Sequence, residues 1–251
     1  MGLLDKILAK DKGPSPRQLR RAMKQVTQIH GDAATRVGAL ERLAEWGTPE
    51  AASTLLRRFT VQVSQGSMDL EEKQYTVRLI VQIGQSAVEP IVQYLQTEPE
   101  VTWPVRALRE LLPPQEFDDA IKNVLDRLAT GYHRWPEAKS VLIEHLSDDA
   151  FPQIRATMLK FLEDENDDVL VAAAQYLARH ADEEIRERLI ETLLGSEHRP
   201  RVRGRIFELF QEHDWPVKGY RKRVEEVIAE PFYLTAKGDY PVDKEGIQNP
   251  E

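Results

Sequence analysis

The chain has 251 residues, of which 41% are hydrophobic and 30% are charged, with a formal net charge of −8. This balance is typical of a folded helical protein with a charged surface and excludes an intrinsically disordered chain. Cysteine is absent, which excludes disulfides, thiolate metal sites and thiol nucleophiles and favours a reducing, bacterial cytoplasm. No apolar run approaches the roughly 20 residues that a transmembrane segment needs.

Residues 1–10 predict a short amphipathic helix, followed by a linker that ends at residue 15. Asp5 and Lys6 interrupt the apolar stretch and no small-residue cleavage site follows, which argues against a signal peptide. We expect the helix to dock on the first repeat, with reversible attachment to a membrane or a partner as the alternative. Its apolar face consists of Leu3, Leu4, Ile7 and Leu8.

Residues 16–30 predict a second amphipathic helix, which we expect to cap the repeats that follow. One face is apolar and the other is basic. The apolar residues are Leu19, Met23, Val26 and Ile29. The basic residues are Arg17, Arg20, Arg21 and Lys24.

Most of the remaining chain repeats one pattern about every 30 residues. Apolar residues recur at i, i+3, i+4 and i+7, the spacing of a helix with one buried face. Because the connections are short, neighbouring helices should run antiparallel, and stacking of successive pairs should supply the core. We predict six helix pairs, in residues 35–64, 69–98, 101–131, 134–165, 166–198 and 199–230.

Two stretches resemble a known family. Residues 79–95 are similar to HEAT repeats of the phycobilisome-lyase type, in which a first helix ends in Gly and the second contains Ala-Val-x-Pro. Residues 164–169 resemble the acidic turn between such repeats, although the next position, usually Arg, is Leu170 here. The resemblance implies an all-α fold, a right-handed α-solenoid of HEAT-like, armadillo-like pairs within residues 16–230. It implies no particular function, because repeat folds serve many roles.

Three Trp-Pro pairs predict helix starts, where the missing proline N–H costs nothing. The first two lie 32 residues apart, one repeat period. We expect each tryptophan to pack back on its helix, with exposure to a partner as the alternative. The pairs are Trp103-Pro104, Trp135-Pro136 and Trp215-Pro216.

The helical pattern ends at residue 231, and residues 231–251 predict an extended C-terminal tail. The tail carries Phe232, Tyr233 and Tyr240. We expect its aromatic side chains to lie on the last helix pair, with a free docking peptide as the alternative.

Motifs for catalysis or metal binding are missing from the sequence. None of the six histidines is followed directly by Glu, whereas deoxyhypusine hydroxylases, a HEAT-repeat enzyme class, hold two irons through repeated His-Glu pairs. No Gly-x-Ser-x-Gly elbow, phosphate-binding loop or dinucleotide fingerprint is present. We therefore expect no enzyme activity, no catalytic residue, no metal and no cofactor.

Charge is distributed unevenly between two adjacent blocks. Residues 137–197 hold fifteen acidic and six basic residues, whereas residues 199–223 hold eight basic and three acidic residues. The basic block keeps open a nucleic-acid-binding or alkylpurine-DNA-glycosylase-like HEAT solenoid, although a phosphate-tracking groove should stay positive along its length. The repeat subtype keeps open a bilin lyase or tetrapyrrole chaperone, and the fold would also suit a helper subunit of a larger machine. Adjacent blocks of opposite charge also favour a complementary protein partner or head-to-tail self-association, with a solvated charged surface that has no selected target as the alternative.

The expected function is that of a non-catalytic scaffold or adaptor that binds a protein partner on a concave face made by the second helices. Contact residues should lie off the apolar stripes of those helices. They are Arg57, Arg58, Gln93, Tyr94, Lys122, Arg127, Arg155, Arg186 and Arg221. Charge reversal of Arg155 together with Arg186 should then weaken partner binding without unfolding the protein.

Overall fold

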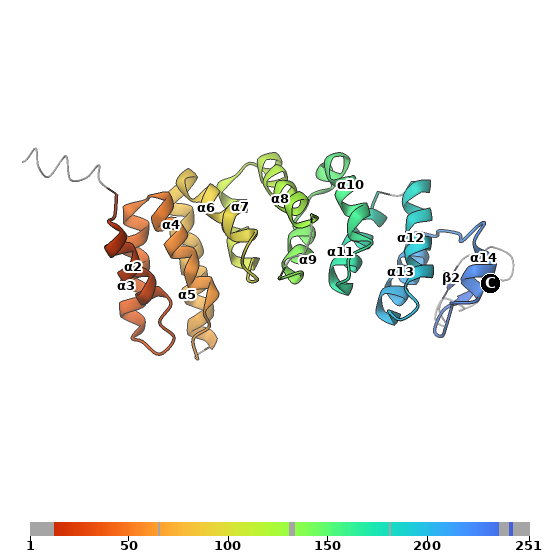
Figure 1. Ribbon diagram of the computed structural model, residues 1–251, viewed down its shortest axis with the longest axis horizontal. Coiled ribbons are helices and arrows are strands. Elements are labelled where there is room, and N and C mark those ends of the chain that lie inside the picture. Colours follow the sequence, from red (N-terminus) through yellow and green to blue (C-terminus); the bar gives the residue numbers. More distant parts are fainter. Residues whose placement is uncertain (1–12, 65, 131–133, 181, 236–240, 243–251) are drawn as a thin grey trace, which may run out of the picture. The chain divides into compact units, whose positions relative to one another are not determined.

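The computed structural model describes residues 13–64, 66–130, 134–180, 182–235 and 241–242. These residues are predominantly helical, which confirms the all-α prediction, and they include a short two-stranded ladder near the C-terminus (Figure 1). The chain divides into two compact units, Met1–Arg127 and Leu128–Glu251. Among the described helices, none is both long and apolar enough to cross a membrane.

Short helices joined by tight turns make up the first unit. The 3-10 turns η1 (Arg57–Thr60) and η2 (Gly84–Ala87) directly follow α4 and α5. The α-helices are α2 (Pro16–Val26), α3 (Ala33–Trp46), α4 (Pro49–Leu56), α5 (Gly66–Ile83), α6 (Val88–Leu95), α7 (Thr102–Leu111) and α8 (Pro114–Leu128).

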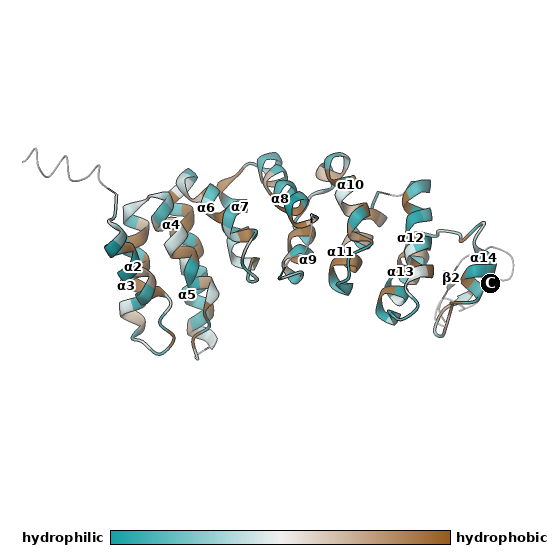
Figure 2. Ribbon diagram, in the orientation of Figure 1, coloured by the Kyte–Doolittle hydropathy of each residue, from teal (hydrophilic) through white to brown (hydrophobic). Residues whose placement is uncertain are grey.

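The helices of the first unit pack in two rows. In one row α5 lies between α3 and α7, and in the other α4 packs on α6. Contacts of α3 with α4 and of α6 with α7 join the rows, and apolar bands recur along these helices (Figure 2). Leu40, Leu55, Ile80 and Ile91 are fully buried in this packing. Helix α2 lies against α3 and α4, where the sequence predicts a capping helix.

Local signals fix the ends of these helices. Ser15, Asp32 and Thr48 each precede a helix, and each side chain accepts a hydrogen bond from a backbone N–H of the first turn. Gly47 ends α3 with φ of 63°, and Gly84 follows α5 with φ of 77°. Glycine takes this left-handed conformation without a Cβ clash. The glycine at 84 is the one that the family resemblance places at the end of a first helix.

A buried ion network joins η1, α3 and α5. Arg58 Nη2 lies 2.6 Å from Asp69 Oδ1, and its Nε lies 3.1 Å from Glu72 Oε2. Arg36 adds a second guanidinium, with Nη2 2.7 Å from Glu72 Oε1. Burial acts to raise the pKa of both carboxyls, but ion pairs with Lys73, Arg58 and Arg36 outweigh it and hold each pKa below its ordinary value. Both acids are therefore ionised at neutral pH.

The second unit also consists of short helices, with a ladder at its C-terminal end. A 3-10 turn, η3 (Asp148–Ala150), leads directly into α10. The α-helices are α9 (Glu137–Glu144), α10 (Phe151–Phe161), α11 (Asp167–Ala178), α12 (Glu183–Gly195), α13 (Pro200–Glu212) and α14 (Arg221–Glu225). The strands are β1 (Tyr233–Leu234) and β2 (Pro241–Val242).

Helix α11 is the centre of the second unit. It packs against α9, α10, α12 and α13. Its buried Ala172, Ala173 and Ala174 have small side chains, which let neighbouring helices approach closely. Asn166 and Asp182 accept backbone hydrogen bonds at the starts of α11 and α12, as expected for polar residues at helix starts.

The C-terminal segment folds back onto α13. The Phe232 ring lies 5.2 Å from the Phe207 ring, and Phe232 is buried. Strands β1 and β2 pair antiparallel with Tyr233 opposite Val242, and β2 contacts α13. This confirms for Phe232 that a tail aromatic lies on the last helix pair. Tyr240 and residues 243–251 lie outside the described residues.

Two helices lie in or near each of the six predicted ranges, and α7 and α9 begin beside the first two Trp-Pro pairs as expected. The helix start predicted at Pro216 is wrong, because the next helix begins only at Arg221. The Trp215 N–H instead donates to the Phe210 carbonyl at 2.8 Å, and its ring meets the Phe210 ring edge-on. Trp215 therefore closes the end of α13 rather than opening a helix.

Candidate interaction surfaces

The nine predicted contact residues all belong to the second helix of a predicted pair. The first unit holds six of them, and the second unit holds three. Their positions are Arg57 and Arg58 in η1, Gln93 and Tyr94 in α6, Lys122 and Arg127 in α8, Arg155 in α10, Arg186 in α12 and Arg221 in α14.

Arg58, Tyr94 and Arg186 are buried, so the expectation that they are accessible is wrong. Arg58 turns inward because α4 gives way to a 3-10 turn, whose roughly 3.0 residues per turn shift the helical phase. Tyr94 lies three residues after buried Ile91, on the apolar stripe itself. Burial raises the pKa of its hydroxyl, which has no hydrogen-bond partner among the described residues. Arg186 lies on the buried side of α12, where it donates to the Pro216 carbonyl.

The other six residues are wholly or partly accessible, and several join consecutive second helices. Arg57 Nη1 lies 2.6 Å from Glu98 Oε1, just beyond α6. Arg127 of α8 donates to Gln96 Oε1 at 3.0 Å. Arg155 of α10 forms ion pairs of 2.7 and 2.8 Å with Asp182 and Glu184, at the start of α12. Lys122, Gln93 and Arg221 pair locally with Asp126, Glu89 and Glu225.

These contacts change the expectation for the double reversal of Arg155 and Arg186. Arg186 is 8% exposed, pairs with Glu183 and donates to a backbone carbonyl. A carboxylate at this position would be buried beside a second carboxylate, so the variant should lose stability as well as any binding. A double reversal of Arg155 and Arg186 therefore cannot distinguish a loss of partner binding from a loss of stability.

The acidic turn at residues 163–168 is bound by basic residues from other helices of the second unit. Lys139 Nζ lies 2.8 Å from Asp164 Oδ2, and Arg188 Nη2 lies 2.7 Å from Glu163 Oε1. Basic residues from the start of α13 complete the set. These pairs are Arg199 with Asp167 and Arg201 with Asp168.

Four of the eight basic residues in the block at 199–223 thus form ion pairs within the unit. Arg205 pairs with Glu208 and Glu212, and Arg221 pairs with Glu225. A phosphate backbone would have to displace these carboxylates. The geometry therefore does not favour the nucleic-acid alternative.

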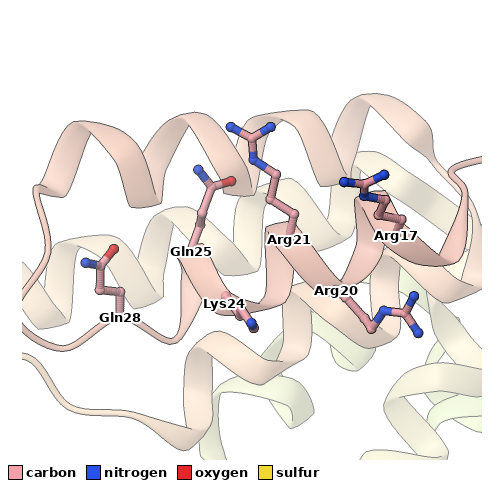
Figure 3. Close-up of a pocket in the computed structure, with 6 residues that line it drawn as sticks. All are labelled: Arg17, Arg20, Arg21, Lys24, Gln25 and Gln28. Atoms are coloured by element: carbon pink, nitrogen blue, oxygen red, sulfur yellow. The ribbon is translucent and has the colours of Figure 1, made fainter.

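Helix α2 carries a different kind of basic surface, formed by Arg17, Arg20, Arg21 and Lys24 together with Gln25 and Gln28 (Figure 3). The four basic side chains are exposed, and none has an ion pair with a described residue. Arg42 of α3 donates to Gln25 Oε1 at 2.9 Å, which places a fifth basic side chain at the edge of this surface. The sequence predicts that the helix bearing this face caps the repeats. The missed signal is the absence of any acidic residue between Asp11 and Asp32.

The second unit also has an open hollow across its first helices, α9, α11 and α13. It is lined by Glu144, Gln175, Tyr176, Arg205 and Glu212, among others. Charges of both signs meet there, so it carries no strong preference for an anion or a cation. It lies on the first helices, whereas the predicted contact residues lie on the second helices.

Within the described part of the chain, no group of three or more His, Asp and Glu side chains is placed to hold a metal ion. The clustered acids instead face Arg or Lys, as in the pairs of Asp69 with Arg58 and of Asp167 with Arg199. These arrangements connect helices and do not resemble an acid–base couple aimed at a substrate.

Comparison with protein-family models, with curated proteins and with solved structures finds no match. The HEAT resemblance therefore rests on residues 79–95 and 164–169 and on the paired helices. The described residues define a predominantly helical protein of short paired helices, and its function has to be inferred from its surfaces.

Proposed function

We propose that this chain is a non-catalytic scaffold, a HEAT-like α-solenoid that holds a protein partner on the face formed by its second helices. Such a solenoid is a right-handed superhelix in which stacked helix pairs share their cores. The two-row packing within the first unit and the central position of α11 in the second support this reading. The natural setting for such an adaptor is the cytoplasm of a bacterium.

The observation that carries the proposal is the set of polar contacts between successive second helices. Arg57–Glu98 and Arg127–Gln96 connect α4, α6 and α8 in the first unit, and Arg155–Asp182 connects α10 and α12 in the second. These contacts hold surface side chains in a fixed arrangement before a partner arrives. Such preorganisation lowers the entropy lost on binding.

The proposed contact residues are the accessible members of the predicted set. Arg58, Tyr94 and Arg186 would support the surface from below. Because the accessible charges are already paired within the chain, they should contribute more to partner choice than to affinity. The contact residues are Arg57, Gln93, Lys122, Arg127, Arg155 and Arg221.

Affinity capture from a lysate of the native cells tests the proposal. The full chain is immobilised, and capture is compared at two salt concentrations with and without nuclease. A protein that is retained after nuclease treatment supports the scaffold. Recovery that disappears with nuclease would replace the scaffold with a nucleic-acid binder, while leaving the fold unchanged.

A further inference from the structure

The open hollow of the second unit has an apolar floor. It lies across α9, α11 and α13, and α11 packs between the other two helices (Figure 1). Ile143, Ala172 and Leu209 belong to the floor, and all three are buried. The short side chain of Ala172 leaves room between α9 and α13. The hollow has a volume of about 340 Å³. An apolar cavity of about 150 Å³ already holds benzene, so one large apolar side chain can enter it.

Charged residues from the C-terminal ends of the same three helices form the rim of the hollow. Glu144 is the last residue of α9, Arg179 directly follows α11, and Glu212 is the last residue of α13. All three side chains are exposed and line the hollow. Because α11 lies between α9 and α13, the rim presents an acid, a base and an acid in that order.

Contacts within the unit hold the basic side chains of the hollow in place. Arg179 Nη1 lies 3.1 Å from Asp148 Oδ1, and Arg179 Cζ lies 4.6 Å from the centre of the Tyr176 ring. Arg205, which lines the wall, has Nη1 2.7 Å from Glu212 Oε1. The wall is therefore ordered before anything binds, which lowers the entropy that binding costs.

We propose that this hollow receives one large apolar side chain of a linear protein segment that carries both charges. Protein interfaces have an apolar centre and a polar rim, and their binding energy concentrates in side chains that fill such hollows. Across the acid–base–acid rim, the segment should place basic, acidic and basic residues in turn. Helix axes about 8–10 Å apart make the rim about 20 Å long, so an extended segment of about six residues crosses it. This inference does not depend on the proposed scaffold face of second helices.

Two other kinds of ligand fit the hollow less well. A nucleic acid would bring its phosphates to a rim that holds two carboxylates, which would repel them. A free apolar molecule would cover the floor but would make no use of the charges around it. The order of charges on the rim therefore favours a protein segment.

Photo-crosslinking of the full chain in a lysate of the native cells tests the proposal. The photoreactive residue p-benzoylphenylalanine replaces His213, which lines the hollow and is exposed. Mass spectrometry then identifies the attached segment. We expect a protein segment with a large apolar residue and the basic–acidic–basic order. A synthetic peptide of that sequence should bind the wild type, and alanine at its apolar residue should weaken binding at least about 30-fold, as for a hot-spot residue.

Matched variants of the chain separate the floor from the rim. Ala172→Phe fills the hollow from α11 and should weaken binding of the peptide at least about 30-fold. Val171→Phe adds the same side chain at the neighbouring, half-buried position, which does not line the hollow, and should bind like the wild type. Glu144→Lys should weaken binding, and a peptide with Glu in place of its facing basic residue should restore it. Circular dichroism checks that each variant is folded.

Four results would overturn the proposal. They are the absence of a crosslinked protein, a crosslink to nucleic acid, a crosslinked segment without the apolar residue or the charge order, and equal binding of the peptide to Ala172→Phe and Val171→Phe. Binding that disappears at high salt would contradict the apolar anchor, because salt screens charges but leaves apolar burial favourable. None of these results bears on the partner captured by the second-helix face.

Discussion

Arg199 at the start of α13 binds Asp167 at the start of α11, with Nε 2.6 Å from Oδ1. The same guanidinium donates to the backbone carbonyls of Asp164 and Glu165 at 3.1–3.2 Å. In the HEAT family that this turn resembles, Arg is usual where this chain has Leu170. An arginine from the next helix pair thus binds the acidic turn here.

Arg199→Ala should lower the free energy of unfolding by about 1–3 kcal/mol, because a carboxylate and two carbonyls lose their donor. Arg199→Lys should recover only part of it, since an ammonium cannot reproduce the planar fork. Urea unfolding measures both. Arg201→Ala is the control, because its pair with Asp168 is more exposed and should contribute less than about 1 kcal/mol. Equal losses at 199 and 201 would contradict the assigned role.

Arg57 and Arg58 are neighbours with opposite expected behaviour. Arg58→Ala removes the fully buried guanidinium that Asp69 and Glu72 share, although Lys73 and Arg36 remain beside them, and should cost about 3–5 kcal/mol of stability. Arg57→Ala breaks a partly exposed pair with Glu98 and should cost less than about 1 kcal/mol. Thermal and urea unfolding of both variants test this. If Arg58→Ala were as stable as Arg57→Ala, the assignment of Arg58 to a buried ion network would be contradicted.

His180 should make the second unit sensitive to mild acid. Its ring stacks on Phe151 at 3.9 Å, and burial lowers its pKa, with Arg179 adding to this and Asp148 opposing it. A lowered pKa means that the unfolded chain takes up the proton more readily. The contribution of neutral His180 to the free energy of unfolding is therefore complete above about pH 6.5. It is lost as the pH falls through the folded-state pKa of His180.

Thermal unfolding of the wild type and of His180→Phe, measured from pH 8 to pH 5, tests this prediction. The phenylalanine keeps the stacked ring but has no proton to gain. The loss of stability between about pH 6.5 and 5 should therefore be smaller in the variant. Identical pH profiles would show that His180 titrates as in the unfolded chain.

Phe232 should anchor the C-terminal segment to α13. Phe232→Ala removes a buried ring from Phe207 and should destabilise the second unit by up to about 3 kcal/mol. Limited proteolysis should then cut the chain near residue 231 earlier than in the wild type. Phe232→Leu, which keeps apolar volume, should resist longer than the alanine variant. Unchanged cleavage in both would contradict the packing.

The helices could be predicted from sequence because each carries its own local signals. Asp182 before α12 and Gly84 after α5 cap or end helices through chemistry that the sequence displays. The periodicity of buried leucines then located the helix pairs. Pro216 shows the limit, because its Trp-Pro signal is overridden by the contact of Trp215 with Phe210.

The interaction residues were predicted less well, because accessibility depends on helical phase and on distant partners. A change from α to 3-10 geometry at Arg57–Thr60 turned Arg58 inward, and no residue type in that segment indicates the change in the sequence. The partners of Arg57 and Arg155 lie 41 and 27 residues away, so sequence spacing could not reveal them. The α2 basic face was visible in the sequence, but the sequence could not show that no described carboxylate pairs with it.

The most direct test of the scaffold is to compare protein capture by three forms of the chain. Gln93→Glu/Arg127→Glu changes exposed residues of the second helices α6 and α8, and Gln74→Glu/Arg78→Glu makes the same chemical change on the first helix α5. After nuclease treatment of the lysate, the wild type and the α5 variant should retain the same partner protein. The α6/α8 variant should no longer retain it. Equal retention by all three, or loss from the α5 variant alone, would contradict binding on the second-helix face.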